Sequence, residues 1–267
     1  MKKIISILLA AIMMTTAFAG CGKAKSTGDE SLKKVQDKGE FVLGLDDAFP
    51  PMGYRNANNE IVGFDIDLAK EVTSRMGVKL KLQPIAWDSK DQELNSGNID
   101  CIWNGMSIDA EKEKAMNLSE PYMKNRMVLM VLKDSGYTSQ ADLKGKKVGV
   151  QNGSTAQGIL EKSDFAKTAD EIIGYDNNLI ACMDLERKGV DALFLDEVYA
   201  NYYIAQKKNC VVLEDSSLAD EEYAIGFRKA DQKLRDEVQK TLSEMKADGK
   251  LAEISTKWFG KDVTIVK

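Results

Sequence analysis

The sequence predicts an α/β fold built as two lobes. From residue 41 onward, short apolar segments typical of strands alternate with segments whose apolar residues recur at helical spacing. This alternation restarts after Pro121, so the chain contains two α/β series in succession. Two such series indicate two lobes, and a chain of 267 residues is long enough for each to have its own core.

The first series begins with the segment after residue 40. Its apolar runs predict three strands, at residues 41–45, 78–82 and 99–103. Asp65 is predicted to cap a helix whose apolar residues share one face and which ends at Gly77. Asp109 is predicted to cap a short helix that runs to Asn117.

The second series follows the same pattern. Its predicted strands are residues 127–132, 147–150, 172–175 and 192–195, with helices at 155–161 and 178–188 between them. A further strand is predicted at 223–227. The helix after it has one apolar face, which consists of Leu234, Val238, Leu242 and Met245.

The N-terminus has the pattern of an exported lipoprotein. Lysines 2 and 3 precede an apolar stretch, and small residues lead to Cys21, as in a secretory signal peptide over residues 1–20. The segment resembles a bacterial lipobox, which implies cleavage before Cys21 and lipidation, with palmitate, of that residue. The polar residues 21–31 would then form the lipidated end and a flexible tether. The alternative is an uncleaved anchor, but the apolar stretch 4–14 is too short for a bilayer of about 30 Å.

The reactive side chains limit the available chemistry. The chain has no histidine, which removes Ser-His and Cys-His nucleophile pairs and most zinc sites. The other cysteines lack the paired spacing of metal sites. We expect Cys101 and Cys182 to be small buried hydrophobes, with a disulfide between Cys182 and Cys210 as the less favoured alternative. The sequence predicts no metal and no cofactor.

The charge balance argues against nucleic acid as a partner. The chain has 37 Lys+Arg against 42 Asp+Glu, and loss of Lys2 and Lys3 with the leader leaves a net charge near −7. Nucleic-acid phosphates favour basic surfaces. No segment after Cys21 approaches membrane length, so we expect contact with a membrane only through the N-terminal lipid.

Five short segments resemble motifs of one protein family. They are GFDIDLA at 63–69, IDCIWNGMSI at 99–108, SEPY at 119–122, VDALFLD at 190–196 and WFG at 258–260. Their order is similar to that of the polar amino-acid binding proteins of ABC importers, extracellular solute-binding family 3, over about residues 41–260. The resemblance therefore does not depend on one short motif.

This resemblance implies a two-lobed clamp of the type II periplasmic-binding-protein class with two crossover hinge strands. Lobe 1 would contain residues 32–123 and 223–267, and lobe 2 residues 124–222. The chain would cross between the lobes near residues 122–126 and 218–223. The family resemblance also implies a monomer.

The resemblance places a ligand site between the lobes, with a partner for each part of a free amino acid. For the carboxylate, the family has an arginine where this chain has Lys112, which keeps the charge but loses the bidentate fork. The alternative is a solvated lysine. Ser107 offers a backbone N–H and a hydroxyl, and the turn with Gln151, Ser154 and Thr155 precedes a helix whose free N–H groups suit an anion. Such a turn can also be simply a helix cap.

The ammonium and the side chain of the ligand need other partners. The resemblance implies Asp196 for the ammonium, although an acid at the end of a strand more often caps the next helix. It implies Phe49 and Trp87 as aromatic rings on either side of the ligand, although each ring alone would be assigned to the core.

Asp46 follows the first strand and is placed to accept a hydrogen bond from the tip of the ligand side chain. Asn104 and the carbonyl of Gly105 would complete the floor of the site. An acid at this position favours a cationic or amide side chain, and cystine and other zwitterions stay open. The sequence does not determine which amino acid binds.

The function implied by the resemblance is a lipid-anchored receptor on the extracellular face of the membrane, or in the periplasm of a cell with an outer membrane. It would bind a polar amino acid and deliver it to an ABC permease, without catalysis. Two alternatives stay open on the same fold: a periplasmic dehydratase acting on prephenate or arogenate, and the sensor lobe of a signalling protein.

Overall fold

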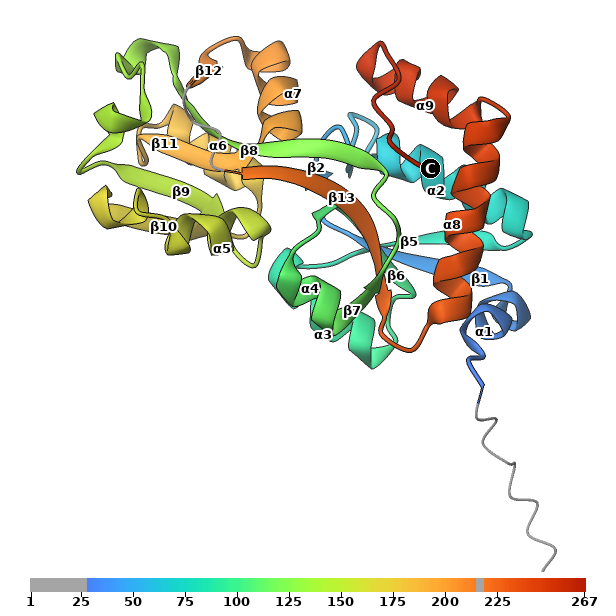
Figure 1. Ribbon diagram of the computed structural model, residues 1–267. Helices are drawn as coiled ribbons and strands as arrows, with labels where there is room; N and C mark the ends of the chain where they lie inside the picture. Colours follow the sequence, from blue (N-terminus) through green and yellow to red (C-terminus); the bar gives the residue numbers. More distant parts are fainter. Residues whose placement is uncertain (1–27, 215–218) are drawn as a thin grey trace, which may run out of the picture.

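Two α/β lobes joined by two long strands make up the protein. The computed structural model describes residues 28–214 and 219–267, and Figure 1 shows the two lobes side by side with strands β8 and β13 running between them. The predicted signal peptide, Cys21 and most of the predicted tether lie outside the described residues, so those predictions stay open.

Lobe 1 contains both ends of the described chain. Its strands are β1 (Glu40–Leu45), β2 (Ala48–Phe49), β3 (Gly53–Arg55), β4 (Ile61–Val62), β5 (Lys79–Pro84), β6 (Cys101–Ser107) and β7 (Met116–Leu118). Its helices are α1 (Ser31–Lys38), α2 (Phe64–Met76), α3 (Lys90–Ser96), α4 (Ala110–Ala115), α8 (Gln232–Ala247) and α9 (Lys250–Phe259).

Lobe 2 contains the middle of the chain. Its strands are β9 (Lys147–Gln151), β10 (Glu171–Tyr175), β11 (Ala192–Asp196) and β12 (Cys210–Val212). Its helices are α5 (Thr155–Lys162), α6 (Asn178–Glu186) and α7 (Glu197–Lys207). Strands β9, β10 and β11 and helices α5 and α6 lie within two residues of the elements that the second series of the sequence predicts, whereas β12 and α7 are not predicted.

The crossing strands are β8 (Met123–Leu132) and β13 (Ala219–Arg228), which pair antiparallel with each other from Ala219–Met127 to Tyr223–Met123. Beyond this ribbon, β13 pairs with β6 and β7 of lobe 1, and β8 pairs with β11 and β12 of lobe 2. One sheet therefore continues through both lobes, in the order β10-β9-β11-β8-β13-β6-β1-β5. A ribbon of two strands can bend as a hinge while the lobes stay intact.

Amphipathic helices cover the sheet in lobe 1. The four predicted apolar residues of α8 are fully buried, as are Leu68, Ala69 and Val72 of α2. The predicted stop of α2 at Gly77 is confirmed, because Gly77 has the left-handed conformation with φ of 71°. The exact lobe borders given above stay a prediction.

The predicted cap of α2 is wrong. The helix begins at Phe64 after Gly63, so Asp65 lies inside the first turn and points into the lobe. Its buried carboxylate accepts the N–H of Gly105 at 2.7 Å and the hydroxyl of Tyr122 at 2.9 Å. Burial raises the pKa of Asp65 to about 7, against the effect of these two donors.

Three element ends also differ from the predictions. The cap at Asp109 is confirmed, but α4 ends at Ala115 because residues 116–118 pair with β13 as strand β7. Strand β6 continues to Ser107 instead of ending at Trp103. Ser31, at the end of the predicted tether, is buried as the first residue of α1, and its hydroxyl accepts the N–H of Leu234 at 3.1 Å.

The thiols of Cys101, Cys182 and Cys210 are free and buried. The less favoured disulfide is therefore not formed, and burial raises the pKa of the Cys182 thiol far above its usual value. Within residues 28–214 and 219–267, no helix has the length and apolar character needed to cross a bilayer.

Candidate functional site

A cavity lies between the two lobes, beside the strands that join them. The space left free in this cavity is about 20 Å³, which is room for about one water molecule. Its wall contains every residue that the sequence analysis assigns to the ligand, namely Asp46, Phe49, Trp87, Asn104, Gly105, Ser107, Lys112, Gln151, Ser154, Thr155 and Asp196. Met106 and Met127 complete the wall. The structure therefore brings all the predicted residues together, while their roles toward a ligand stay a prediction.

The floor of the cavity comes from the end of β6. Gly105 has a left-handed φ of 59°, and a Cβ there would lie 3.0 Å from the ring of Phe49. The bond from its N–H to Asp65 fixes this backbone from below. Asp65, which the sequence analysis predicts to be a helix cap, thus supports the floor of the site. The burial of a motif carboxylate could not be predicted without knowing what packs on α2.

Lobe 2 contributes a turn that leads into α5. Ser154 is the N-cap of this helix, and its hydroxyl accepts the N–H of Gln157 at 3.0 Å. Thr155 is the first residue of the helix, where backbone N–H groups have no partner within the helix itself. The turn is therefore a helix cap, which is the alternative that the sequence analysis gives for it. The same cap places Ser154 and Thr155, at the start of α5, in the wall of the cavity.

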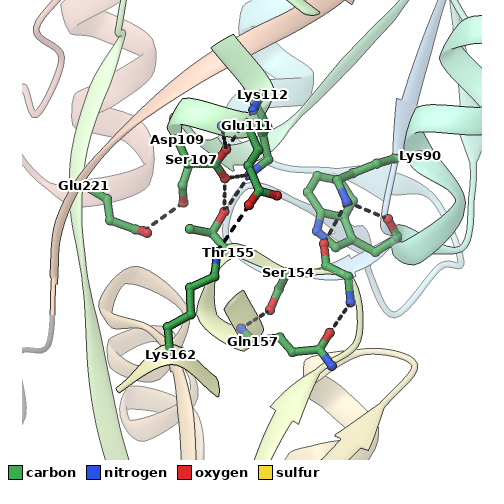
Figure 2. Close-up of polar contacts among 12 residues, drawn as sticks. Lys90, Ser107, Asp109, Glu111, Lys112, Ser154, Thr155, Gln157, Lys162 and Glu221 are labelled. Atoms are coloured by element: carbon green, nitrogen blue, oxygen red, sulfur yellow. Dashed lines mark hydrogen bonds and ion pairs between the residues drawn. The ribbon is translucent and has the colours of Figure 1, made fainter. Parts of the chain in front are cut away.

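Lys112 is held between the lobes (Figure 2). Its ammonium forms an ion pair with Asp109, the N-cap of its own helix, and donates to the hydroxyl of Thr155 at 2.8 Å. Its side chain is only 12% exposed, so the alternative of a solvated lysine is wrong. The prediction that Lys112 meets a carboxylate is untested, but a cation does lie at this point of the cavity wall.

Asp46 also meets the opposite lobe. One oxygen accepts the side-chain N–H of Gln151 at 2.8 Å, and the other accepts the N–H of Ala48 at 2.9 Å. Asn178 donates to the other end of the Gln151 amide at 3.0 Å, which fixes the orientation of this amide. Burial raises the pKa of Asp46, whereas the two donors lower it. Asp46 and Gln151 together form one end of the cavity.

Asp196 is the N-cap residue of α7 by position, but its side chain makes no capping bond. Its carboxylate instead accepts hydrogen bonds from Asn125 at 2.8 Å and from the hydroxyl of Tyr223. Both donors lie on the crossing strands β8 and β13. Burial and the nearby charge of Glu221 raise the pKa of Asp196 to about 7.

Glu221 is a neighbour of the site that the sequence analysis misses. This residue of β13 is 8% exposed and accepts from Ser107 at 2.8 Å and from Asn125 at 3.3 Å. Burial raises its pKa, while these donors lower it. Asn125 thus bridges two carboxylates between the lobes. In sequence, Glu221 stands in an acidic run and has no distinguishing pattern.

The two predicted aromatic residues are both buried. Phe49 packs on Tyr199 of α7 with ring centroids 5.4 Å apart, so this ring contacts lobe 2 as well as the cavity. Trp87 lies below the ammonium of Lys90, which is 5.3 Å from the ring centroid. The sequence analysis also misses Lys90, which has the appearance of an ordinary surface lysine between acidic residues.

The fold and the cavity define a two-lobed binding protein of the type II periplasmic class. The family model of bacterial extracellular solute-binding proteins, family 3, matches residues 41–261. The chain belongs to this family.

Relatives of known activity extend over nearly the whole chain. The arginine-binding extracellular protein ArtP of Bacillus subtilis is 33% identical over 97% of this chain and 98% of its own length. The L-cystine-binding protein TcyJ of Escherichia coli is 29% identical over 94% of this chain and 95% of its own. These relatives are binding proteins by name.

Solved structures have the same architecture. The substrate-binding protein of an ABC uptake transporter from Streptococcus pneumoniae, with bound histidine, is 37% identical and superposes with a TM-score of 0.84. The superposition covers 90% of this chain and 99% of that one. The two-lobed fold predicted from the sequence is thereby confirmed.

Proposed function

We propose that this protein is the substrate-binding component of an ABC importer and that it binds a polar amino acid with a cationic or amide side chain. The observation that carries the proposal is the composition of the cavity wall. Buried acids lie at two points, Asp46 and Asp196, and a cation with helix N–H groups lies at a third. A free amino acid with a donor at the tip of its side chain matches this distribution of charge.

Each part of the ligand has a proposed partner. The α-carboxylate would bind at Lys112, Ser107 and the N-terminus of α5, where the backbone dipole favours an anion. The α-ammonium would bind at the free oxygen of Asp196. The remaining residues of the wall would hold the side chain.

The side-chain end of the site limits the ligand class. The tip would donate to Asp46, with Phe49 and Trp87 against the chain before it. Arginine, histidine, lysine, ornithine and glutamine all satisfy this arrangement. Cystine also fits, because its second ammonium can donate to Asp46.

Binding would shut the clamp. A ligand that touches Ser107 in lobe 1 and Thr155 in lobe 2 binds the shut form more tightly than the open one, and it shifts the population by that difference. The permease would recognise the shut form.

Lipid on Cys21 would keep the receptor at the extracellular face of the membrane, and two acyl chains are enough for stable anchoring. We further propose that the protein acts as a monomer and catalyses no reaction. Incubation with prephenate should therefore leave that compound unchanged.

Calorimetry and thermal unfolding with the twenty amino acids, ornithine, citrulline and cystine test the proposal. A specific ligand raises the midpoint of unfolding by mass action. Asp46→Ala and Asp196→Ala should each abolish the shift, because each leaves a donor of the buried ligand without a partner. Asp47→Ala is the matched control, since Asp47 pairs with Arg55 at 2.6 Å on the rim and does not line the cavity. A full shift in both cavity variants, or no binding of any amino acid by the unaltered protein, would refute the proposal.

A further inference from the structure

Lys90 is a lysine with an unusual position for a cation. It is the first residue of α3 in lobe 1 and is 5% exposed. Its ammonium donates to the carbonyl of Trp87 at 3.2 Å and, across the cleft, to the carbonyl of Gly153 in lobe 2 at 2.7 Å. Figure 2 shows Lys90 and Lys112 both facing the segment that contains Ser154 and Thr155.

This arrangement is costly for the protein. Among the described residues, no carboxylate lies within ion-pair distance of the Lys90 ammonium, and burial lowers the pKa of Lys90. A buried ammonium is expensive to desolvate, and an apolar side chain of the same length would fill the space at lower cost. The stability of the fold therefore does not explain why a charged side chain occupies this position.

The partner of Lys90 lies where the backbones of the two lobes come close together. Gly153 has a left-handed φ of 67°, and a Cβ on it would lie 2.6 Å from the Cα of Asp88. Because backbone meets backbone here, Gly153 can reach this position only as glycine. Its carbonyl belongs to the planar peptide unit that leads into Ser154, the N-cap of α5. A bond to that carbonyl therefore fixes the orientation of the turn that precedes the free N–H groups of the helix.

The two lysines near this turn differ in how their positive charge is compensated. Lys112 is already paired with Asp109, so its positive charge is largely compensated. The ammonium of Lys90 lies near enough to Lys112 for the two charges to repel, while Asp88, Asp91 and Asp109 offset part of its charge. An arriving carboxylate would thus gain from Lys90 the positive potential that Lys112 alone does not supply.

We propose that Lys90 is a positioning residue that holds the turn Gln151–Thr155 of lobe 2 against lobe 1 and so couples capture of the ligand carboxylate to closure of the clamp. The inference rests on the proposed function, and it adds a residue outside the cavity wall that selects for a free α-carboxylate. It acts through Gly153 and through its charge, without contact with the ligand.

The test compares ligands with and without the carboxylate. Affinities of L-arginine and L-glutamine are measured by calorimetry against those of L-argininamide and L-glutaminamide, for the unaltered protein and for Lys90→Met. This variant keeps the length of the side chain and removes its charge and donors. We expect the preference for the acid over its amide to fall about tenfold or more, mainly through faster dissociation of the acid. The unliganded variant should unfold at the same or a higher temperature, because a buried ammonium is gone.

Two further variants distinguish an effect on carboxylate capture from a general effect on closure of the clamp. Gly153→Ala retains Lys90 but places a Cβ against Asp88, so it should weaken acid and amide alike. Lys162→Met removes a third lysine contact between the lobes, an exposed ion pair with Glu111 at 3.2 Å, and should change neither affinity. An equal loss for acid and amide in Lys90→Met, or no loss, would overturn the inference and leave the proposed function standing. Failure of the unaltered protein to bind any of the amino acids would overturn both.

Discussion

Asp196 and Glu221 illustrate how single residues carry the chemistry of this protein. Both are buried acids between the lobes, and the side chain of Asn125 donates to both. The raised pKa of Asp196, about 7, means that the group holds a proton near neutral pH when no cation faces it. Its contribution to stability is fully present below the usual value of 3.8 and is lost as pH rises through about 7.

Ligand binding is therefore expected to release a proton. An ammonium stabilises the ionised form of Asp196, so at pH 6 binding must expel the proton that the group carries. Affinity should fall as pH drops from 8 to 5, approaching about tenfold per unit well below the pKa. The raised pKa of Asp46 acts in the same direction for a cationic ligand side chain. Calorimetry in buffers of different ionisation enthalpy measures the protons released, and an affinity that is constant over this range would contradict the prediction.

At the scale of elements, the start of α2 positions the floor of the cavity. Gly63 brings the chain so close to the loop after β2 that a Cβ would lie 2.1 Å from the carbonyl oxygen of Met52. This approach buries Asp65, which in turn fixes Gly105 in the end of β6. One backbone position thus determines how a helix, a loop and a strand meet below the ligand site.

Gly63→Ala should therefore destabilise the protein and weaken binding. The φ of 151° is unfavourable for alanine, which costs about 1–3 kcal/mol before the clash is counted. Urea unfolding measures the loss. Gly77→Asn is the matched control: the φ is also positive, but no atom lies within 4 Å of the added Cβ, and asparagine tolerates this conformation. Equal stability of the two variants would show that the contact with Met52 is not decisive.

At the scale of the whole molecule, contacts across the cleft hold the two lobes together on both sides of the cavity. On one side of the cavity, Lys90 of α3 and Lys112 of α4 donate hydrogen bonds to lobe 2. Lys162 of α5 forms an ion pair with lobe 1. On the other side, Tyr54 of β3 meets Tyr202 of α7 with ring centroids 5.6 Å apart. Such contacts form only when the lobes approach, so they add to the free energy of closure without touching the ligand.

Tyr202→Ala should weaken ligand binding although Tyr202 does not line the cavity. An aromatic pair contributes about 0.5–1.5 kcal/mol, so we expect a loss of roughly two- to tenfold, seen as faster dissociation in stopped-flow measurements. Small-angle scattering with saturating ligand should still show the compact form. Unchanged dissociation would mean that this pair does not contribute to closure.

Much of the site could be predicted from the sequence because the motifs that resemble the family contain or adjoin its residues, which occur at the ends of strands or at the starts of helices. Asp46, Gln151 and Asp196 follow apolar runs, and residues at the carboxyl ends of strands meet at one edge of a sheet. Lys90, Glu221 and Asn125 could not be found in this way, because each stands among charged or polar neighbours and its partners come from distant parts of the chain.

The sequence by itself determined the two α/β series, the family and the set of residues around the cavity, because apolar periodicity and short motifs are local properties of the chain. Only the tertiary structure decided that Asp65 supports Gly105, that Asp196 is held by the crossing strands and that Lys90 reaches Gly153. Each of these contacts joins residues at least 27 positions apart. Which buried charge meets which donor depends on how the lobes pack together, and no local pattern encodes that packing.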